Sequence, residues 1–324
     1  MKTSRLAAAL PLLFAVSLPV SSHADALSQK LHDGFEGRDF APEGGLYYKD
    51  NDEQAAGTYT FQTGEKREGK QSLRLDVREL CQADADNCSE RAEIWEKPEL
   101  RVPYDKGVWV GFSVKFGDPV PQDDHRYLIA QWKREIGPEA QGDFSPFLAL
   151  RMRNGKLFAT VETNYHEPVR GESAENSQAR CAPGEAPIWP RPETNQIRAL
   201  IAGDGSWTRA DGTEFTACSA NIQVTSHGNP LPEPESGWMD FAIYTRPGPK
   251  GDGHVEIFAN GKWIVTVKGA IGHGDPGLLE NQYFKFGPYR AAGKGLWTMF
   301  YDEYRRSPDC IDVLKDRKAC DAVH

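Results

Sequence analysis

The stretch YFKFGPYR near the C-terminus, residues 283–290, carries groups that could move a proton. At the period of two of a β-strand, Tyr283, Lys285 and Tyr289 point to one face, and the two phenylalanines and Pro288 point to the other. A tyrosine beside cations can act as a general base, and as a phenol it can act as a general acid. The stretch therefore predicts a proton-transfer face on a strand whose other face lies in a core.

Three further segments set a charged or amide face against an apolar face. The polar residues that share a face are Arg91 and Glu93 in SERAEIW, Gln131 and Lys133 in YLIAQWK, and Arg151 and Arg153 in FLALRMRNG. Any one of these faces can be the solvent side of a half-buried sheet. Because the chain as a whole is acidic, the four faces together favour a single groove for an extended anionic ligand.

Such a groove could support β-elimination in an acidic polysaccharide. The C5 proton of a uronate lies next to a carboxylate, and it becomes removable when arginine, glutamine or lysine neutralises that carboxylate. A base then takes the proton, and an acid protonates the glycosidic oxygen that leaves C4. Tyr289, with Lys285 and Arg290 near it in the sequence, supplies this combination without a metal.

Three short motifs resemble those of known enzymes. RAEIW, QWK and YFKFGPYR are similar to the three strand motifs of jelly-roll polysaccharide lyases, namely R-x-E, Q-x-H and a C-terminal Y-x-K-x-G-x-Y. In alginate lyases of this fold the last motif is nearly YFKAG-x-Y. The wider pattern, with SGWMDFAIYTR and FANGKW, more closely resembles the heparin lyase I and glucuronan lyase group. The resemblance runs in order from about residue 33 to 306 and implies a β-jelly-roll (concanavalin-like) polysaccharide lyase.

The resemblance also implies roles for single residues. Tyr289 matches the catalytic tyrosine, and Lys285 matches the lysine four residues before it. Gln131 matches the glutamine that contacts the substrate carboxylate, and Arg91 matches the arginine of the R-x-E motif. Glu93 is expected to orient Arg91. The other groups expected to bind substrate are Lys133, Arg151, Arg153, Tyr283 and Arg290, together with Glu93 itself.

One position departs from the motif. Where the alginate lyases have a histidine two residues after the glutamine, this chain has Lys133. His166 in TNYHEP could supply the base, as could His125 in DDHRY. Otherwise Tyr289 serves as both base and acid, which a syn elimination permits, and Lys133 could then help to neutralise the carboxylate. The sequence leaves these alternatives open.

Strand patterns dominate the rest of the chain. Alternating or β-branched and aromatic runs include QSLRLDVREL, GVWVGFSVKF, RYLIAQWKRE, FLALRMRNGKLFATVET, MDFAIYTR, HVEIFANGKWIVTVKG and TMFYDEYRR. Asn-Gly pairs at 154–155 and 260–261 mark hairpin turns. We expect an all-β sandwich of two antiparallel sheets, a jelly roll with a concave substrate groove, and one short helix in DVLKDRKACD.

The segment from about 166 to 237 interrupts this pattern, because it is rich in Pro, Gly, Ser, Glu and Asn. It is expected to be a long insertion that either covers one rim of the sheet or is tolerated without a role, with IRALIAG as its one strand or helix. Six cysteines allow fifteen connectivities. Nearest-neighbour disulfides are expected: Cys81–Cys88, Cys181–Cys218 and Cys310–Cys320. None has the spacing of a zinc site.

The N-terminus has the three parts of a secretory signal peptide over residues 1–26. Lys2 and Arg5 precede an apolar run, and small residues offer a cleavage site after Ala24 or Ala26. The apolar run is too short for a membrane anchor. Residues 27–324 are expected to form a single domain and a monomer, in the periplasm or the medium of a bacterium.

The net charge of the full chain is −9. Loss of Lys2 and Arg5 with the leader brings it to −11, or to −10 when Asp25 leaves too. Because an acidic exported protein binds nucleic acid and anionic membranes poorly, the expected partner is an anionic polysaccharide in a locally basic groove. A glucuronate-containing polymer is the first expectation. No cofactor is expected to be required, and a structural calcium ion in acidic loops such as DNDE and GDG stays open.

Two other functions fit the same architecture. A glycoside hydrolase would need two carboxylates on one groove face, whereas Glu93 stands alone among cations, and Asp302 and Glu303 have opposite parity. A non-catalytic, lectin-like jelly roll would use the basic groove without needing Tyr289 among cations. Replacing Tyr289 with phenylalanine separates the lectin-like function from the lyase function, because a lectin keeps its affinity and a lyase loses turnover.

Overall fold

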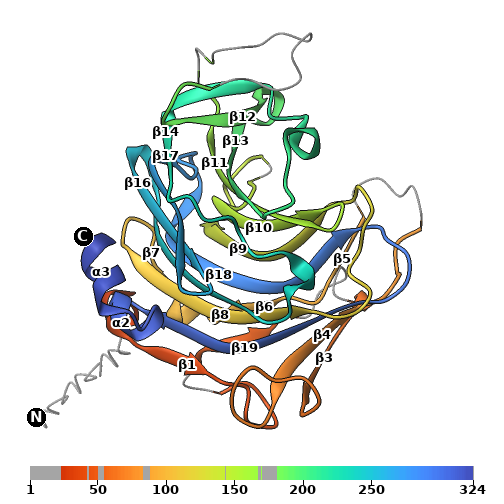
Figure 1. Cartoon of the computed structure of the whole chain (residues 1–324). Helices are drawn as coiled ribbons and strands as arrows, with labels where there is room; N and C mark the ends of the chain where they lie inside the picture. Colours follow the sequence, from red (N-terminus) through yellow and green to blue (C-terminus); the bar gives the residue numbers. More distant parts are fainter. Residues whose placement is uncertain are drawn as a thin grey trace, which may run out of the picture.

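The computed structural model describes residues 23–41, 44–49, 55–82, 88–142, 144–166, 169 and 181–323. Within these ranges the regular structure is dominated by β-strands, and every pairing between named strands is antiparallel (Figure 1). The α-helices are short: α1 (His23–Ser28), α2 (Cys310–Val313) and α3 (Arg317–Val323). No helix in the described part is long and apolar enough to cross a membrane. The all-β prediction is confirmed.

The strands form an outer and an inner layer. In pairing order the outer layer contains β3 (Gly57–Gln62), β4 (Ser72–Val77), β19 (Trp297–Ser307), β8 (Val108–Phe116), β15 (Met239–Arg246), β16 (Gly248–Ala259), β17 (Lys262–Ile271) and β14 (Ala217–Ser226), with β1 (Leu31–Asp33) beside β19. Figure 1 shows β8 and β19 curving below β9 and β18 of the inner layer.

The inner layer begins with β2 (Leu46–Tyr48) beside β6 (Ile94–Glu96). Then β5 (Ser89–Arg91), β6 and β7 (Val102–Pro103) pair with successive parts of β18 (Leu278–Ala291), which is followed by β9 (Tyr127–Ile136), β10 (Leu148–Arg153), β11 (Lys156–Asn164), β13 (Gln196–Gly203) and β12 (Glu185–Arg191). Because β12 also pairs with β14, the two layers join at one edge.

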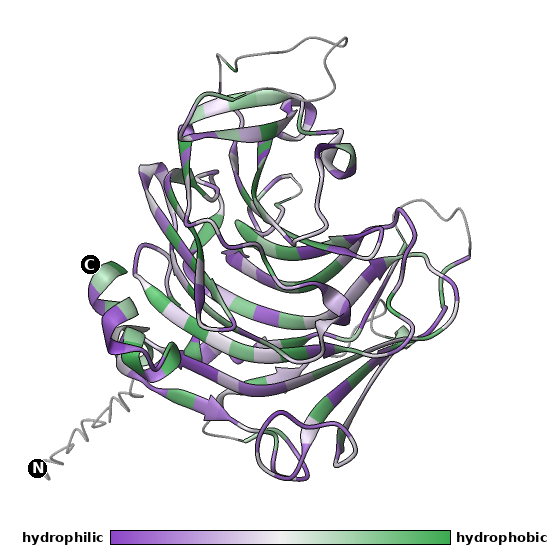
Figure 2. Cartoon of the chain, viewed as in Figure 1, coloured by the Kyte–Doolittle hydropathy of each residue, from purple (hydrophilic) through white to green (hydrophobic). Residues whose placement is uncertain are grey.

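The main core lies between the layers and follows from alternation along the strands, visible as bands in Figure 2. Phe284 of β18 contacts Phe112 of the outer layer with 5.5 Å between ring centroids, and Phe286 contacts Tyr301 at 4.8 Å. Burial of one such side chain stabilises the fold by about 2–3 kcal/mol. Lys285, the one residue between these phenylalanines, therefore points away from the core.

The described part of the segment predicted as an insertion contains three strands, β12, β13 and β14, where the sequence predicts at most one strand or helix. Its apolar side chains Ala186, Ile188, Ile197 and Ala199 are buried in the main core, and β13 pairs directly with β11. Prolines hide β12 in the sequence EAPIWPR, because proline lacks the N–H that strands use and is a poor strand signal. The described part of this segment therefore extends the inner layer with β12 and β13 and the outer layer with β14.

Local sequence signals are confirmed at the hairpins and the cysteines. Asn154 and Asn260 adopt left-handed φ values of 51° and 49° in the β10–β11 and β16–β17 turns. All three nearest-neighbour disulfides are formed: Cys81–Cys88, Cys181–Cys218 and Cys310–Cys320. The last disulfide links α2 to α3, so the stretch predicted as one short helix contributes to two. Val313 of α2 packs with Trp109 of the outer layer.

Candidate active site

The inner layer brings the sequence-predicted polar faces side by side. On β18, Tyr289 lies opposite Arg91, Lys285 lies opposite Gln131, and Tyr283 lies opposite Lys133. The pairing of β18 with β9 shifts register between Phe286 and Tyr289. Gly287 lies in this irregularity with φ 121°, where a Cβ atom would meet the Ala92 carbonyl, so the close approach of β18 to residue 92 requires glycine.

A buried carboxylate organises three of these groups. Glu93 is 1% exposed. Its Oε1 accepts a hydrogen bond from Gln131 Nε2 at 2.6 Å, and its Oε2 accepts from Lys285 Nζ at 3.0 Å and Arg91 at 3.3 Å. A buried carboxylate is costly unless it is paired and hydrogen-bonded, so these contacts are strongly coupled. We call Glu93, Arg91, Gln131 and Lys285 the Glu93 cluster.

Tyr289 is the half-buried aromatic residue beside this cluster. Its ring centroid lies 4.1 Å from the guanidinium carbon of Arg91, 5.0 Å from that of Arg126 and 6.0 Å from Lys285 Nζ. Arg126 has no place in the sequence motifs, because it precedes β9 and reaches the tyrosine only through the pairing of β9 with β18.

Lys285 is buried, and burial lowers its pKa to about 7. The positive charges of Lys133 and Arg91 act in the same direction, whereas Glu93 opposes the shift. The Nζ atom of Lys285 lies 4.5 Å from the ring centroid of Trp95. This ring stacks on that of Tyr283, with 5.5 Å between the centroids. Burial raises the pKa of Tyr283, so its phenol stays neutral.

A second carboxylate in the inner layer is absent from the sequence motifs. Glu162 of β11 is fully buried and receives hydrogen bonds from Arg151 at 3.0 Å and from Arg198 of β13 at 2.7 Å, with Arg191 of β12 at 3.9 Å. Burial alone would raise its pKa, but the arginines hold the pKa below its ordinary value. Burial lowers the pKa of Arg151 to about 9. We call Glu162, Arg151, Arg198 and Arg191 the Glu162 cluster.

His273 is a further residue that the sequence motifs do not single out. It is 2% exposed, and within the described chain neither ring nitrogen has a partner at hydrogen-bond geometry. Burial lowers the pKa of its ring. The positive charge of Lys133 lowers this pKa further, whereas the negative charge of Glu162 raises it. Its backbone is held by Tyr104 and by Arg134, which donates to its carbonyl at 2.8 Å. It lies in the β17–β18 connection, where short motifs give no signal.

Two arginines expected in the groove lie elsewhere. Arg290 is 1% exposed and donates to Glu90 at 2.6 Å and to the carbonyls of residues 293–295. Neighbouring residues of a strand face opposite sides, so Arg290 points away from Tyr289. Arg153, near the end of β10, pairs with Glu214 at 2.8 Å and Asp124 at 3.0 Å. Both arginines hold loops through these contacts, and their role in substrate binding stays a prediction.

Neither histidine considered as a base is joined to Tyr289 by a described contact. His166 bonds Ser219 Oγ at 3.1 Å and the Asn164 carbonyl at 3.3 Å. His125 contacts the Ala292 carbonyl and packs against Tyr127. The structure thus brings Arg91, Glu93, Gln131 and Lys285 together around Tyr289 and places both histidines in other local networks.

Possible metal ligands are sparse in the described residues. One group of three, Cys181, Glu185 and Cys218, comes close enough to hold an ion, but its two cysteines form a disulfide and so cannot act as thiolates. The acidic stretch DNDE, residues 50–53, lies outside the described residues. GDG occurs at 203–205, where β13 ends and a loop begins, and at 251–253 within β16. The calcium expectation therefore stays untested.

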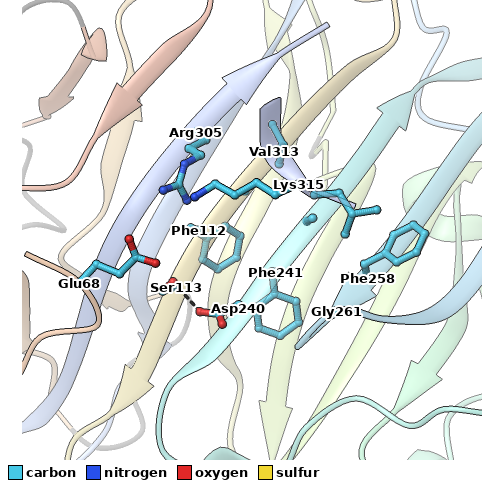
Figure 3. Close-up of a pocket in the computed structure, with 13 residues that line it drawn as sticks. Glu68, Phe112, Ser113, Asp240, Phe241, Phe258, Gly261, Arg305, Val313 and Lys315 are labelled. Carbon is cyan, nitrogen blue, oxygen red and sulfur yellow. Dashed lines mark hydrogen bonds between the residues drawn. The ribbon is translucent and has the colours of Figure 1, made fainter. Parts of the chain in front are cut away.

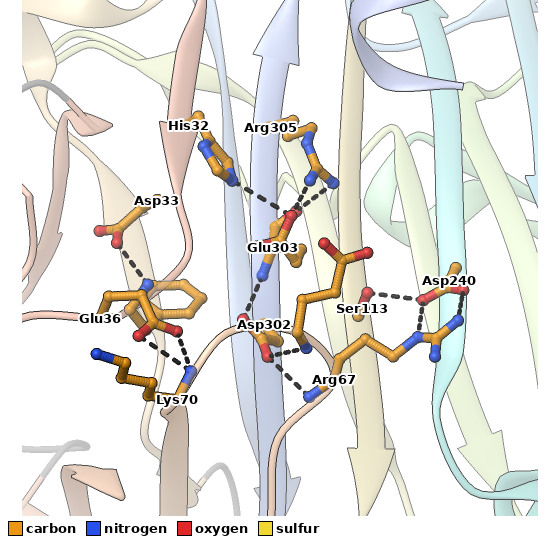
Figure 4. A network of polar contacts seen from close by, with 12 residues as sticks. His32, Asp33, Glu36, Arg67, Lys70, Ser113, Asp240, Asp302, Glu303 and Arg305 are labelled. Carbon is orange, nitrogen blue, oxygen red and sulfur yellow. Dashed lines mark hydrogen bonds and ion pairs between the residues drawn. The ribbon is translucent and has the colours of Figure 1, made fainter. Parts of the chain in front are cut away.

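The outer layer carries its own pocket and polar network, on strands other than those around Tyr289. The pocket is lined by residues of β8, β15 and β19 together with Val313 and Lys315 (Figure 3). Within this lining Asp240 accepts from Ser113, and it also accepts from Arg67, while Asp302 accepts from the backbone N–H groups of Arg67 and Glu68 (Figure 4). These carboxylates fasten the β3–β4 loop to the outer layer. Burial raises the pKa of Asp302 to about 6.

The fold and the site define a carbohydrate-processing jelly roll with a cationic, tyrosine-containing inner layer. The profile of the polysaccharide lyase family matches residues 39–305. The chain therefore belongs to this family and is a polysaccharide lyase. A search among curated proteins finds no match.

Solved structures support the fold. An endo-β-1,4-glucuronan lyase from the fungus Trichoderma reesei aligns with a TM-score of 0.57 and 13% identity, covering 88% of this chain and 96% of that one. An alginate lyase of polysaccharide lyase family 7 aligns with a TM-score of 0.41 and 11% identity, over 87% and 95% of the two chains. The first likeness shows the shared β-jelly-roll fold that the sequence predicts.

Proposed function

We propose that this polysaccharide lyase cleaves a uronate polymer, with glucuronate at the cleavage site, by β-elimination on the inner layer. The observation that carries the proposal is the Glu93 cluster beside Tyr289. Lys285, Arg91 and Gln131 converge on Glu93, and Lys133 lies near enough to Lys285 to lower its pKa. Cationic and amide donors beside a phenol suit a substrate whose carboxylate must be neutralised before a proton leaves.

The steps follow from these groups. Arg91, Gln131 and Lys285 bind the uronate carboxylate, so that negative charge can develop on it while the C5 proton leaves. Tyr289 takes that proton as phenolate, the C4–O bond breaks, and a double bond forms between C4 and C5. The proton on Tyr289 then passes to the departing glycosidic oxygen. One residue performs both transfers, as a syn elimination permits.

The buried carboxylates argue against a hydrolytic alternative. A glycosidase needs one protonated carboxyl as acid and a second carboxylate as base or nucleophile. Glu162 has its pKa lowered despite burial, and Glu93 accepts three hydrogen bonds from Arg91, Gln131 and Lys285. Carboxylates committed to cations in this way are poor general acids.

Glucuronate is proposed for two reasons. The chain has Lys133 where the alginate lyase motif has histidine, and the glucuronan lyase shares the fold over most of both chains. We expect export to the periplasm or medium, action as a monomer, and no cofactor. A chelator should leave the initial rate unchanged. A loss of rate restored by calcium would instead reveal an ion that supports the fold.

The test is a substrate panel. The purified mature protein and its Tyr289→Phe variant are incubated with glucuronan, hyaluronan, heparin, heparan sulfate, alginate and pectate, and the ultraviolet absorbance of unsaturated uronate is followed. The expected result is a rise on glucuronan that vanishes in the variant. A rise confined to alginate or pectate would overturn the glucuronate assignment. Binding without any rise would support the lectin-like alternative.

A further inference from the structure

Trp189 lies in one row with the charged side chains of the Glu162 cluster. In the register of the inner layer, Trp189 of β12 is directly opposite Arg198 of β13, and Arg198 is directly opposite Glu162 of β11. Arg151 of β10 reaches the same carboxylate. Directly opposite residues on neighbouring strands project from the same face of a sheet. The row therefore continues the face that carries Arg151.

The row holds more positive charge than its carboxylate can balance. Three arginines, Arg151, Arg191 and Arg198, surround the single charge of Glu162, which leaves a surplus of two. Arg191 lies farthest from Glu162, at 3.9 Å, and donates its hydrogen bond at 2.8 Å to Gln196 instead. A chain with a net charge of −9 has no general excess of cations to place there.

Trp189 is only half-buried, and two of these arginines flank its ring. The guanidinium carbons of Arg191 and Arg198 each lie 5.2 Å from the ring centroid. An aromatic ring beside two guanidinium groups suits a sugar that carries a carboxylate, because the ring contacts the apolar face of the pyranose and the arginines bind the anion.

We propose that Trp189, Arg191 and Arg198 form a remote subsite for a uronate residue of the same polysaccharide that is cleaved at Tyr289. This inference rests on the proposed function, since it takes its ligand from it. It gives the β12–β13 segment a role in substrate binding. A purely structural role would instead require these groups only to hold β11, β12 and β13 together.

The register sets how long a substrate must be to use the subsite. From β18 to β12 the layer passes through β9, β10, β11 and β13, which makes five steps between strands. At about 4.8 Å per step, Trp189 lies about 24 Å along the sheet from the strand of Tyr289. One pyranose of an extended chain spans about one such step. An octasaccharide can therefore reach both sites, whereas a trisaccharide at Tyr289 cannot.

The experiment measures binding without turnover. Arg191→Gln and Trp189→Leu are each combined with Tyr289→Phe, and dissociation constants for glucuronan and for its trisaccharide are measured by calorimetry. Arg209→Gln is the matched control, because it removes one arginine charge at an exposed position outside the row. Loss of one charge-assisted contact should raise the dissociation constant for the polymer about tenfold and leave that for the trisaccharide unchanged. The control should change neither.

The outcomes separate the two proposals. Unchanged polymer affinity in both variants, with the Tyr289→Phe parent still binding, overturns the subsite alone. Equal weakening of polymer and trisaccharide also overturns it, because the defect would then reach the Tyr289 site. A parent that binds none of the six polymers in the panel overturns the proposed function and the subsite with it. Thermal unfolding checks that each variant folds. If Trp189→Leu does not fold, the affinities of Arg191→Gln alone test the subsite.

Discussion

Glu93 and Glu162, two of the buried carboxylates of the inner layer, each gather cationic side chains, but the groups around them differ. Glu93 holds an arginine, a glutamine and a lysine beside a half-buried tyrosine. Glu162 holds two arginines through hydrogen bonds, with a third near it and a tryptophan in the row. The Glu93 cluster contains a lysine whose pKa falls to about 7, and the ring centroid of Tyr289 lies 6.0 Å from its Nζ.

The difference indicates a division of labour. Arginine keeps its charge under all ordinary conditions, so a cluster of arginines is suited to hold an anion. A buried lysine and a tyrosine can change protonation, so the Glu93 cluster is suited to chemistry. The predictions below test whether turnover depends on the Glu93 cluster and whether the binding of long substrates depends on the Glu162 cluster.

The largest effect is expected for Tyr289→Phe. Loss of the phenolic oxygen should lower kcat about 10²–10⁴-fold, because general acid–base catalysis contributes that much, while stability and polymer affinity stay close to those of the parent. Initial rates on glucuronan check this. Tyr59→Phe, an exposed tyrosine on β3, is the control and should keep full activity. A Tyr289→Phe variant with normal turnover would remove this residue from the mechanism.

Glu93→Gln and Glu162→Gln sharpen the comparison. Each leaves buried cations unpaired and should lower the free energy of unfolding by about 3–5 kcal/mol, measured by urea denaturation. Their activities should differ. Glu93→Gln should lose turnover on the trisaccharide and the polymer alike, whereas Glu162→Gln should affect mainly the polymer. Identical losses on both substrates in both variants would contradict separate roles.

The Cys181–Cys218 disulfide is expected to support the outer end of the Glu162 row. Cys218 pairs with Pro187 of β12, and the bond closes a loop of 37 residues. Replacing both cysteines with serine should lower stability by about 4 kcal/mol and weaken polymer binding more than trisaccharide binding. Removing the Cys310–Cys320 bond by the same substitutions is the control. It should cost about 3 kcal/mol without changing either affinity.

A smaller effect should appear in the pH dependence of stability. Folding lowers the pKa of Lys285 from its ordinary 10.5 to about 7, so between these values the unfolded chain binds more protons than the folded one. The free energy of unfolding contributed by Lys285 must then rise with pH across this window, by at most about 1.4 kcal/mol per pH unit. Lys285→Met should lack this rise. Parallel stability curves for parent and variant would contradict the lowered pKa.

Alternation within strands made much of the fold and part of the site predictable. Strand parity alone places Lys285 and Phe284 on opposite faces of β18. The two Asn-Gly pairs mark the β10–β11 and β16–β17 hairpin turns. Adjacency in sequence misleads for Arg290, which faces Glu90 across the strand from Tyr289. Glu162 meets Arg198 only through a pairing of β11 with β13 that no local pattern encodes. His273 enters through a connection between strands, and the prolines of β12 conceal the strand that carries Trp189.

The central claim is that cleavage at the Glu93 cluster is an elimination. The most direct measurement counts two products of the same glucuronan digest, the new reducing ends and the unsaturated uronate ends seen by ultraviolet absorbance. The account predicts equal numbers of both throughout the reaction, and neither with Tyr289→Phe. Reducing ends without unsaturated ends would mean that water cleaves the chain, which would contradict the account.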